Sequence, residues 1–411
     1  MAEWNSWTAA AIFAAVYAAL ALGEVPGLRL DRPTIALAGA AAMLAFGVMD
    51  LQEAAGAVDP GTIVLLFAMM VLAGRLRLAG LFDAATRIVA ARRPGPRALL
   101  AAVVALSGVL SAFLVNDVVC VALTPLVVGL CRSLGRPAVP YLVALATASN
   151  VGSTATITGN PQNMIIGSLS GISYARFAAR LGPIAVGGLL LTFLTVAFVY
   201  RKTLRETAPP RPARTTLRPH RARRGLLVRS VLVATATVAA FLAGAPAPVA
   251  ALVAAAVMML DRLRPERAFE SVDWPLLVMF AALFAVVHGF EANVVRRWDL
   301  ARWVGEGSPV VPISLASVLL SNLVSNVPAV LLFKPLLAVI PDREQAWLAL
   351  AMSSTLAGNL TLLGSVANLI VAEGARRHGE RLGFLEYLKV GVPLTILTVA
   401  AGVAWLSLTN Y

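Results

Sequence analysis

The sequence is poor in charged residues, histidines and cysteines, and each scarcity excludes a class of protein. Charged residues make up 13% and hydrophobic residues 59% of the 411 residues, whereas soluble domains carry about 25% charged and about 45–50% apolar residues. The two cysteines, Cys120 and Cys131, lie within apolar stretches, which excludes a disulfide framework. The three histidines are scattered and have no metal-ligand spacing. A soluble enzyme and a secreted disulfide scaffold are therefore excluded.

Long uncharged segments recur along the whole chain. A hydrocarbon core of about 30 Å requires about 20 apolar residues of helix, and runs such as 34–49 and 182–200 carry no charge. The first eight residues lack a basic region, so the first segment is expected to be retained rather than cleaved as a signal peptide. The sequence thus predicts an all-α polytopic membrane protein. Its simple spans are 8–23, 34–51, 58–74, 183–200, 226–243, 246–261, 273–290 and 390–408.

Four further apolar stretches are interrupted near their middle. Residues 98–131 and 308–340 are too short for two crossings plus a loop, which predicts two re-entrant hairpins. Residues 138–172 and 345–372 each contain a patch rich in Gly, Ser, Thr and Asn. Polar backbone is tolerated at membrane depth only where protein or water surrounds it. We therefore predict discontinuous helices for these two stretches, and an amphipathic interfacial helix for residues 80–93.

Basic residues gather on one predicted face of the membrane. If both hairpins return to their side of entry, 27 Lys and Arg residues lie on one face and six on the other. The positive-inside rule assigns the first face to the cytoplasm, which places both chain termini outside the plasma membrane. The Pro- and Arg-rich segment 201–225 then becomes a cytoplasmic linker beside the lipid surface. Because no aromatic residues interleave its charges, the net charge of +13 indicates topology and no nucleic-acid partner.

The linker separates two halves that contain similar motifs in the same order. Ser111–Asn116 aligns with Ser321–Asn326 at an offset of 210 residues, and Ser149–Ile165 aligns with Ser354–Ile370 at an offset of 205. Each half has five predicted crossings, an odd number, so the second half is inverted in the membrane. Inverted repeats with broken helices are the plan of many secondary transporters. The predicted repeats are residues 1–200 and 226–411.

The helix breaks predict a site for a small solute and a cation. Helix N-termini direct free N–H groups and partial positive charge at an anion, whereas unwound carbonyls and Ser, Thr and Asn oxygens suit a small hard cation. The glycines are expected to permit the unwound backbone. The expected binding residues are Asn116, Asp117, Ser149, Asn150, Gly152, Ser153, Thr154, Thr156, Gly159, Asn160, Asn163, Ser325, Asn326, Gly358, Asn359, Thr361, Gly364, Ser365 and Asn368.

Two ionisable residues lie inside the predicted hairpins. Asp117 is expected to carry a coupling charge, because a carboxylate within a membrane is expensive and usually functional. The alternative is that it caps a helix that begins at Val118. Lys334 is expected to extend to the outer surface, with attraction of an anion or pairing with Asp117 as alternatives.

At these residues the sequence resembles a known family. The segments SAFLVND (111–117), SNVGSTATITGNPQN (149–163), SNVP (325–328) and GNLTLLGSVAN (358–368) are similar to motifs of the ion transporter superfamily. Its branches include divalent anion/sodium symporters, arsenite permeases and sodium/proton antiporters. In the divalent anion branch a Ser-Asn-Thr motif at each hairpin tip holds a substrate carboxylate. Both threonines are absent here, and the Phe-Leu-Val-Asn-Asp stretch is more similar to the arsenite-permease branch.

We expect a secondary active transporter that moves a small anion or oxyanion by elevator-like alternating access, coupled to a Na⁺ or H⁺ gradient. Arsenite efflux and Na⁺/H⁺ antiport are alternatives within the same superfamily, and an ion channel is a remote one. An enzyme is not expected, because no nucleophile-elbow, zinc-protease or P-loop motif occurs. We expect no cofactor beyond the coupling ion and no ATPase subunit. The resemblance implies a homodimer.

Overall fold

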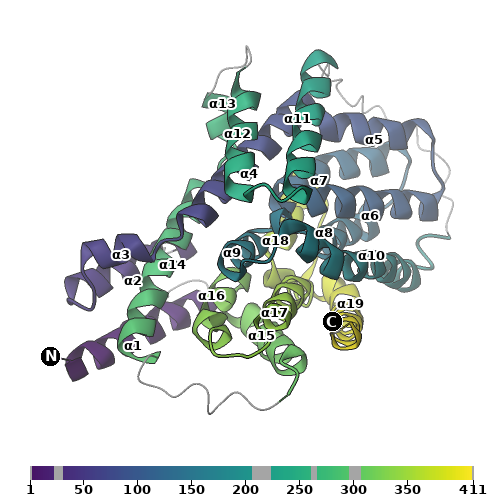
Figure 1. Cartoon of the computed structure of the whole chain (residues 1–411). Coiled ribbons are helices and arrows are strands. Elements are labelled where there is room, and N and C mark those ends of the chain that lie inside the picture. Colours follow the sequence, from purple (N-terminus) through teal and green to yellow (C-terminus); the bar gives the residue numbers. More distant parts are fainter. Residues whose placement is uncertain (1, 23–30, 206–223, 261–265, 296–306, 410–411) are drawn as a thin grey trace.

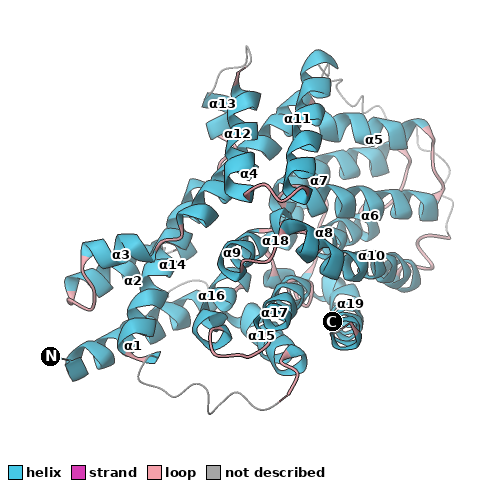
Figure 2. Ribbon diagram, in the orientation of Figure 1, coloured by secondary structure: helices cyan, strands magenta, loops and turns pink. Residues whose placement is uncertain are grey.

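The structure, a computed structural model, is built from helices throughout its described part (Figures 1 and 2). It describes residues 2–22, 31–205, 224–260, 266–295 and 307–409. No strand occurs among these residues, and the predicted all-α class is confirmed. Most of the predicted linker 201–225 lies outside the described residues.

The first four helices of each half correspond in order. They are α1 (Ala2–Leu22), α2 (Arg32–Ala45), α3 (Leu51–Ala57) and α4 (Pro60–Ala79), followed in the second half by α11 (Arg224–Leu242), α12 (Ala247–Met259), α13 (Glu266–Phe269) and α14 (Trp274–Asn293). α4 and α14 both contain 20 residues. Each follows an aspartate whose carboxylate accepts a backbone N–H of the first turn, Asp59 from Thr62 and Asp273 from Leu276. This side-chain cap fixes where each helix begins.

Each half then contains a pair of helices separated by a short break. α6 (Pro96–Phe113) and α7 (Asn116–Ser133) are separated by two residues, and α15 (Val310–Val324) and α16 (Asn326–Leu337) by Ser325 alone. The breaks coincide with the predicted hairpin tips. However, α6 and α7 are each long and apolar enough to cross a membrane. The expectation that this stretch is too short for two crossings is wrong, because its helices extend beyond residues 98–131 at both ends.

The two predicted discontinuous helices are broken at equivalent positions. α8 (Val139–Ser153) and α9 (Pro161–Ser170) flank a 3₁₀ turn at Ile157–Gly159, and α17 (Arg343–Ala357) and α18 (Val366–Arg377) flank one at Leu362–Gly364. The two turns are related by the offset of 205 residues found in the sequence. The local pattern of Gly, Ser and Asn therefore located both breaks.

The last helix of each half is longer than its predicted span. α10 (Tyr174–Val199) and α19 (Phe384–Leu408) begin before the predicted residues 183 and 390 and contain Pro183 and Pro393 inside the helix. The predicted spans begin too late because the first two turns of each helix carry charges such as Arg180 and Lys389. Long charged side chains can extend from a helix end to the membrane surface, so such charges do not end a helix. α5 (Leu81–Ala91) forms where the interfacial helix was predicted.

The second predicted span, 34–51, is wrong at its C-terminal end. α2 ends at Ala45, the chain turns at Gly47 with φ +68°, and α3 begins after Asp50. Asp50 and Glu53 form a reciprocal capping box, which fixes the new helix start. α2 and its counterpart α12 have only 14 and 13 residues, about 20 Å of helix. Among the described residues, eight other helices are long and apolar enough to cross a membrane.

Packing between the halves is reciprocal. α4 of the first half lies along α12 of the second, and α14 of the second half lies along α2 of the first (Figure 1). The repeat-related helices α10 and α19 pack against each other. A two-fold relation between the halves produces such reciprocal contacts. Large apolar side chains on the outer helix surfaces, including Leu190, Leu232, Leu315 and Leu397, are exposed, as expected of a protein surrounded by lipid.

Candidate solute and cation site

The breaks of the two hairpins lie beside one cavity. Asn116 is the first residue of α7 and Asn326 the first of α16, where backbone N–H groups have no partner within the helix. Both side chains are buried, with 4% and 9% of their surface exposed, and both line a cavity of about 220 Å³. Its other polar and charged lining residues are Arg32, Asp117, Gln162, Asp273, Ser325 and Ser365.

A chain of side-chain amides fixes the orientation of Asn116. Asn368 Nδ2 donates to the backbone oxygens of Gly358 at 2.8 Å and Thr361 at 3.1 Å, so its Oδ1 accepts from Asn150 Nδ2 at 3.1 Å. Asn150 Oδ1 in turn accepts from Asn116 Nδ2 at 3.1 Å. Because each amide nitrogen in this chain already donates a hydrogen bond, the position of Asn116 Oδ1 is fixed. This oxygen lies beside the cavity and has no hydrogen-bond partner in the described structure. This unpaired atom is a hydrogen-bond acceptor.

The equivalent residue of the second tip is also unpaired. Asn326 Oδ1 is buried and has no hydrogen-bond partner among the described residues. The preceding Ser325 has φ +79° and ψ 159°, a region that side-chain-bearing residues rarely adopt. Its counterpart Val115 has φ −55° and ψ 121°. The two tips therefore present the same amide on different backbones, and only the second tip stores strain.

Asp117 follows directly at the first tip. Its half-buried carboxylate accepts no hydrogen bond from the described chain, and the N-cap of α7 is Val115. The interpretation of Asp117 as a helix cap is therefore wrong. The carboxylate lines both the first cavity and a second one of about 180 Å³. Asp273 lines the same two cavities, and the charges of the two residues interact.

Most of the expected ligand residues serve the broken helices themselves. Asn163 Nδ2 donates to the backbone oxygens of Ser153 at 3.1 Å and Thr156 at 3.0 Å. Asn160 Oδ1 accepts from the backbone N–H of Asn163 at 2.8 Å, and the Thr156 hydroxyl donates to the Ala112 oxygen. These bonds satisfy backbone groups that the breaks release in the buried interior of the protein. The same atoms are not free for a ligand.

The four expected glycines are needed for close packing rather than for an unusual backbone. None of them has a positive φ. A Cβ at Gly159 would lie 2.2 Å from the Ser153 oxygen, and one at Gly152 would lie 2.2 Å from the Gly108 oxygen. At Gly364 a Cβ would lie 2.9 Å from Asn322 Oδ1, and at Gly358 it would lie 3.2 Å from Asn326 Nδ2. A larger residue would therefore displace the hairpins or the loops.

The structure divides the expected site residues into two groups. Five line the first cavity: Asn116, Asp117, Ser325, Asn326 and Ser365. The others do not: Ser149, Asn150, Gly152, Ser153, Thr154, Thr156, Gly159, Asn160, Asn163, Gly358, Asn359, Thr361, Gly364 and Asn368. Sequence reasoning missed Arg32, Gln162 and Asp273. Asp273 carried a signal, since Val272-Asp273 repeats Val58-Asp59, whereas Arg32 was counted only as a loop charge.

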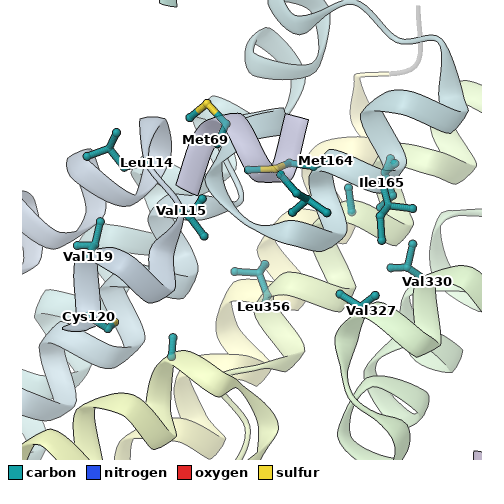
Figure 3. Close-up of a cluster of buried hydrophobic side chains, with 14 of the residues drawn as sticks. Met69, Leu114, Val115, Val119, Cys120, Met164, Ile165, Val327, Val330 and Leu356 are labelled. Atoms are coloured by element: carbon teal, nitrogen blue, oxygen red, sulfur yellow. The ribbon is translucent and has the colours of Figure 1, made fainter. Parts of the chain in front are cut away.

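Apolar side chains surround the tips (Figure 3). They come from both hairpins, from α4 and from the broken helices, and they are buried. Those labelled are Met69, Leu114, Val115, Val119, Cys120, Met164, Ile165, Val327, Val330 and Leu356. This surrounding excludes water from the backs of the tips, which strengthens polar interactions at the cavity.

Lys334 does not approach the cavity. Its ammonium lies 3.5 Å from a carboxylate oxygen of Glu291 on α14. Pairing with Asp117 is therefore wrong. Glu291 is therefore the acidic partner of Lys334 at that end of the hairpin.

Comparison with known proteins identifies the family. The sequence profile of CitMHS, the citrate transporter family, matches residues 16–345 and, in a second match, 295–410. The chain belongs to this family. The CitMHS chain is 32% identical to the silicon efflux transporter LSI3 of Oryza sativa subsp. japonica, over 94% of each chain. It is 28% identical to the transporter arsB of Dictyostelium discoideum, over 92% of this chain and 87% of that one. It is 30% identical to the inner membrane protein YbiR of Escherichia coli, over 84% of this chain and 87% of that one.

Two solved structures have a similar fold. The YdaH transporter of Alcanivorax borkumensis covers 99% of this chain and 97% of its own, with a TM-score of 0.60 and 16% identity. MtrF of Neisseria gonorrhoeae, described as an antimetabolite efflux pump, covers 99% and 96% with a TM-score of 0.64 and 13% identity. At such identities the likeness concerns the fold alone. Together with the family, it establishes a polytopic membrane transporter.

Proposed function

We propose that this CitMHS chain is a secondary active transporter of a small oxyacid, carried as the oxyanion or as its protonated, hydroxylated form, and coupled to H⁺ or Na⁺. The observation that carries the proposal is the mixed chemistry of the 220 Å³ cavity. Asn116 and Asn326 contribute unpaired amide oxygens, and Arg32 contributes a guanidinium with no partner among the described residues. A solute that bears both hydroxyl donors and an acceptor oxygen complements this set.

The charge of the cavity disfavours a bare polyanion. Asp117 and Asp273 supply two carboxylates, and Arg32 supplies one positive charge. A dicarboxylate would add two negative charges to a site that is already net negative, which a low-dielectric environment penalises strongly. A cation bound with the solute removes that penalty. The charge balance therefore supports cation coupling and a solute with at most one negative charge.

The packing supports alternating access of the elevator kind. Helices α6–α10 and α15–α19 contain both hairpins and both broken helices and pack mainly on one another, whereas α1–α4 pack with α11–α14. The cavity lies between the two groups, because Arg32 and Asp273 come from the second group and the tips from the first. In the proposed membrane arrangement the halves are inverted, both hairpins return to their side of entry, both termini lie outside the plasma membrane, and 201–225 is cytoplasmic.

The names of the relatives agree with a small oxyacid. LSI3 is named a silicon efflux transporter and the Dictyostelium relative is named arsB. Both are similar over more than nine-tenths of this chain. Efflux of a hydroxylated oxyacid is thus the direction we propose.

Transport by the purified chain in lipid vesicles tests the proposal. Counterflow of arsenite, silicic acid, sulfate, citrate and succinate is measured in parallel, and H⁺ and Na⁺ gradients are imposed separately. We expect counterflow of a hydroxylated oxyacid, accelerated by one of the two gradients. Arg32→Gln should weaken the affinity for the ionised solute, whereas Arg32→Lys should retain it. Selective transport of citrate or succinate would contradict the assigned solute class.

A further inference from the structure

Asp117 and Asp273 lie together at the junction of two cavities. The first cavity contains both tips, and the second, of about 180 Å³, is lined also by Arg77, Glu270 and Ser271. Asp117 and Asp273 are the two charged residues that line both. Asp117 accepts no hydrogen bond from the described chain, and Asp273 accepts one, from the backbone N–H of Leu276 at 3.1 Å. Most of their lone pairs are therefore available to a ligand.

The repeat-related positions Asp59 and Val327 form no equivalent pair. The counterpart of Asp273 is Asp59, which accepts from the Thr62 N–H, the Thr62 hydroxyl and the Ser168 hydroxyl at 2.5–2.7 Å. The counterpart of Asp117 is Val327, which is apolar. The fold thus duplicates the helices, but the positions that correspond to Asp117 and Asp273 in the other repeats do not form a second open carboxylate pair. A single cation is the ligand that such a pair accommodates.

A third oxygen supports a cation at the same place. Asn116 Oδ1 belongs to a side chain that is only 4% exposed, lies next to Asp117 in the sequence and has no hydrogen-bond partner in the described structure. Its orientation as an acceptor is fixed by the amide chain through Asn150. An unpaired buried acceptor is costly unless something binds it. Carboxylate and amide oxygens are the ligands of small hard cations.

We propose that Asp117 and Asp273 hold the coupling cation, H⁺ or Na⁺, that Asn116 Oδ1 is shared between this cation and the solute through its two lone pairs, and that the second cavity is the access route of the cation. The proposal rests on the proposed function and adds Asp273 as the fixed half of the coupling site. Asp117 moves with the first tip, whereas Asp273 belongs to α14. The cation therefore offsets the repulsion that would otherwise separate tip and scaffold. The charged groups that face the pair are Arg32 on α2, Arg77 on α4 and Glu270 before α14.

No larger metal site competes with this assignment. Across the part of the chain that the structure describes, no group of three His, Cys, Asp or Glu side chains could hold a metal ion. Two carboxylates and one amide oxygen balance a monovalent ion or a proton better than a divalent one when Arg32 contributes a positive charge nearby. The stoichiometry is then one cation per solute.

The test uses Asp273→Asn and Asp273→Ser in the full chain, reconstituted in vesicles. Asn and Ser are good N-cap residues, so both variants keep the acceptor for Leu276 and lose only the charge. The matched control is Asp59→Asn, the same position of the other repeat. Solute counterflow without an ion gradient reports the solute site. Initial rates against pH at fixed Na⁺, and against Na⁺ at fixed pH, report the cation site.

For proton coupling, the wild-type rate should change by about tenfold per pH unit on the limiting limb, the slope of one proton. For Na⁺ coupling, the Na⁺ series should show the equivalent dependence with a Hill coefficient of about one. Both Asp273 variants should still exchange solute by counterflow but lose the ion dependence, as Asp117→Asn should, and the Asp59→Asn control should keep that dependence. Retained dependence in both Asp273 variants would overturn the cation site and leave the solute site intact. Absence of counterflow in the wild type for every solute would instead overturn the proposed function.

Discussion

Asn163 and Asn368 make the same two hydrogen bonds in the two halves of the protein. Asn163 Nδ2 donates to the backbone oxygens of Ser153 and Thr156, and Asn368 Nδ2 donates to those of Gly358 and Thr361. All three pairs of positions differ by 205 residues. The repeat found in the sequence is therefore a repeat of hydrogen-bond geometry, and these asparagines close the breaks rather than bind a ligand.

Replacing either asparagine should destabilise the fold. Asn163→Ala or Asn368→Ala leaves two carbonyl oxygens without their amide donor, and each loss of this kind costs about 1–3 kcal/mol. Asn163→Asp should cost more, because it places carboxylate oxygens against carbonyl oxygens. Melting temperatures in detergent measure the effect, with Asn5→Ala, a partly exposed residue at the protein periphery, as the control. Equal melting temperatures for Asn163→Ala and Asn5→Ala would contradict the closing role.

Replacing the tip asparagines should weaken solute binding without a comparable loss of stability. Asn116→Ala and Asn326→Ala each remove an oxygen that has no protein partner, so the affinity for the solute should fall by about tenfold or more, the effect of one lost hydrogen bond to a bound ligand. Solute-induced shifts in melting temperature measure affinity. Asn293→Ala, whose amide bonds to Val48 and Gly289, is the control. Wild-type affinity in both tip variants would remove them from the site.

The sequence predicted the helix breaks well because their causes are local. Gly, Ser and Asn clusters release the backbone wherever they occur, so the breaks near Ser153 and Gly358 follow from composition. Helix ends follow less directly from the sequence, because charged residues such as Arg180 and Lys389 lie inside α10 and α19 rather than beyond their ends.

The composition of the cavity could not be predicted in the same way. Arg32 and Asp273 reach the tips only through the packing of α2 along α14, a contact between residues far apart in the sequence. For the same reason the sequence could not show which asparagines line the cavity and which bond the backbone at the helix breaks. Asn163 and Asn116 are the same residue type. Only their hydrogen-bond partners in the structure distinguish an amide that closes a helix break from one with an unpaired oxygen.

The predicted topology can be tested by labelling single cysteines. Cys120 and Cys131 are both buried, so an impermeant maleimide should report an introduced cysteine with little background. Arg205→Cys should react only from the cytoplasm, because it lies in the basic linker, and Gln52→Cys should react only from outside. Both side chains are exposed. Reaction of Arg205→Cys from outside the cell would overturn the orientation and the hairpin interpretation with it.

Ser325→Gly should stabilise the protein, whereas the same change at the equivalent Val115 should destabilise it. Ser325 has φ +79°, a conformation that costs about 1–3 kcal/mol for a residue with a side chain and almost nothing for glycine. Relief of that strain exceeds the entropy that glycine loses on folding, about 0.5–1 kcal/mol. Val115 has an ordinary φ and is 1% exposed, so its truncation removes about 1.5–3 kcal/mol of apolar burial.

Melting temperatures of the two glycine variants should therefore shift in opposite directions. The strained serine also bears on transport. A tip without backbone strain gains less free energy from a change of backbone conformation when solute binds. Ser325→Gly is expected to bind solute with altered affinity and to slow the transition between the two access states. Counterflow rate and melting temperature, measured on the same preparation, separate these effects. A fall in stability at Ser325→Gly would show that the serine hydroxyl, rather than its backbone, holds the second tip in place.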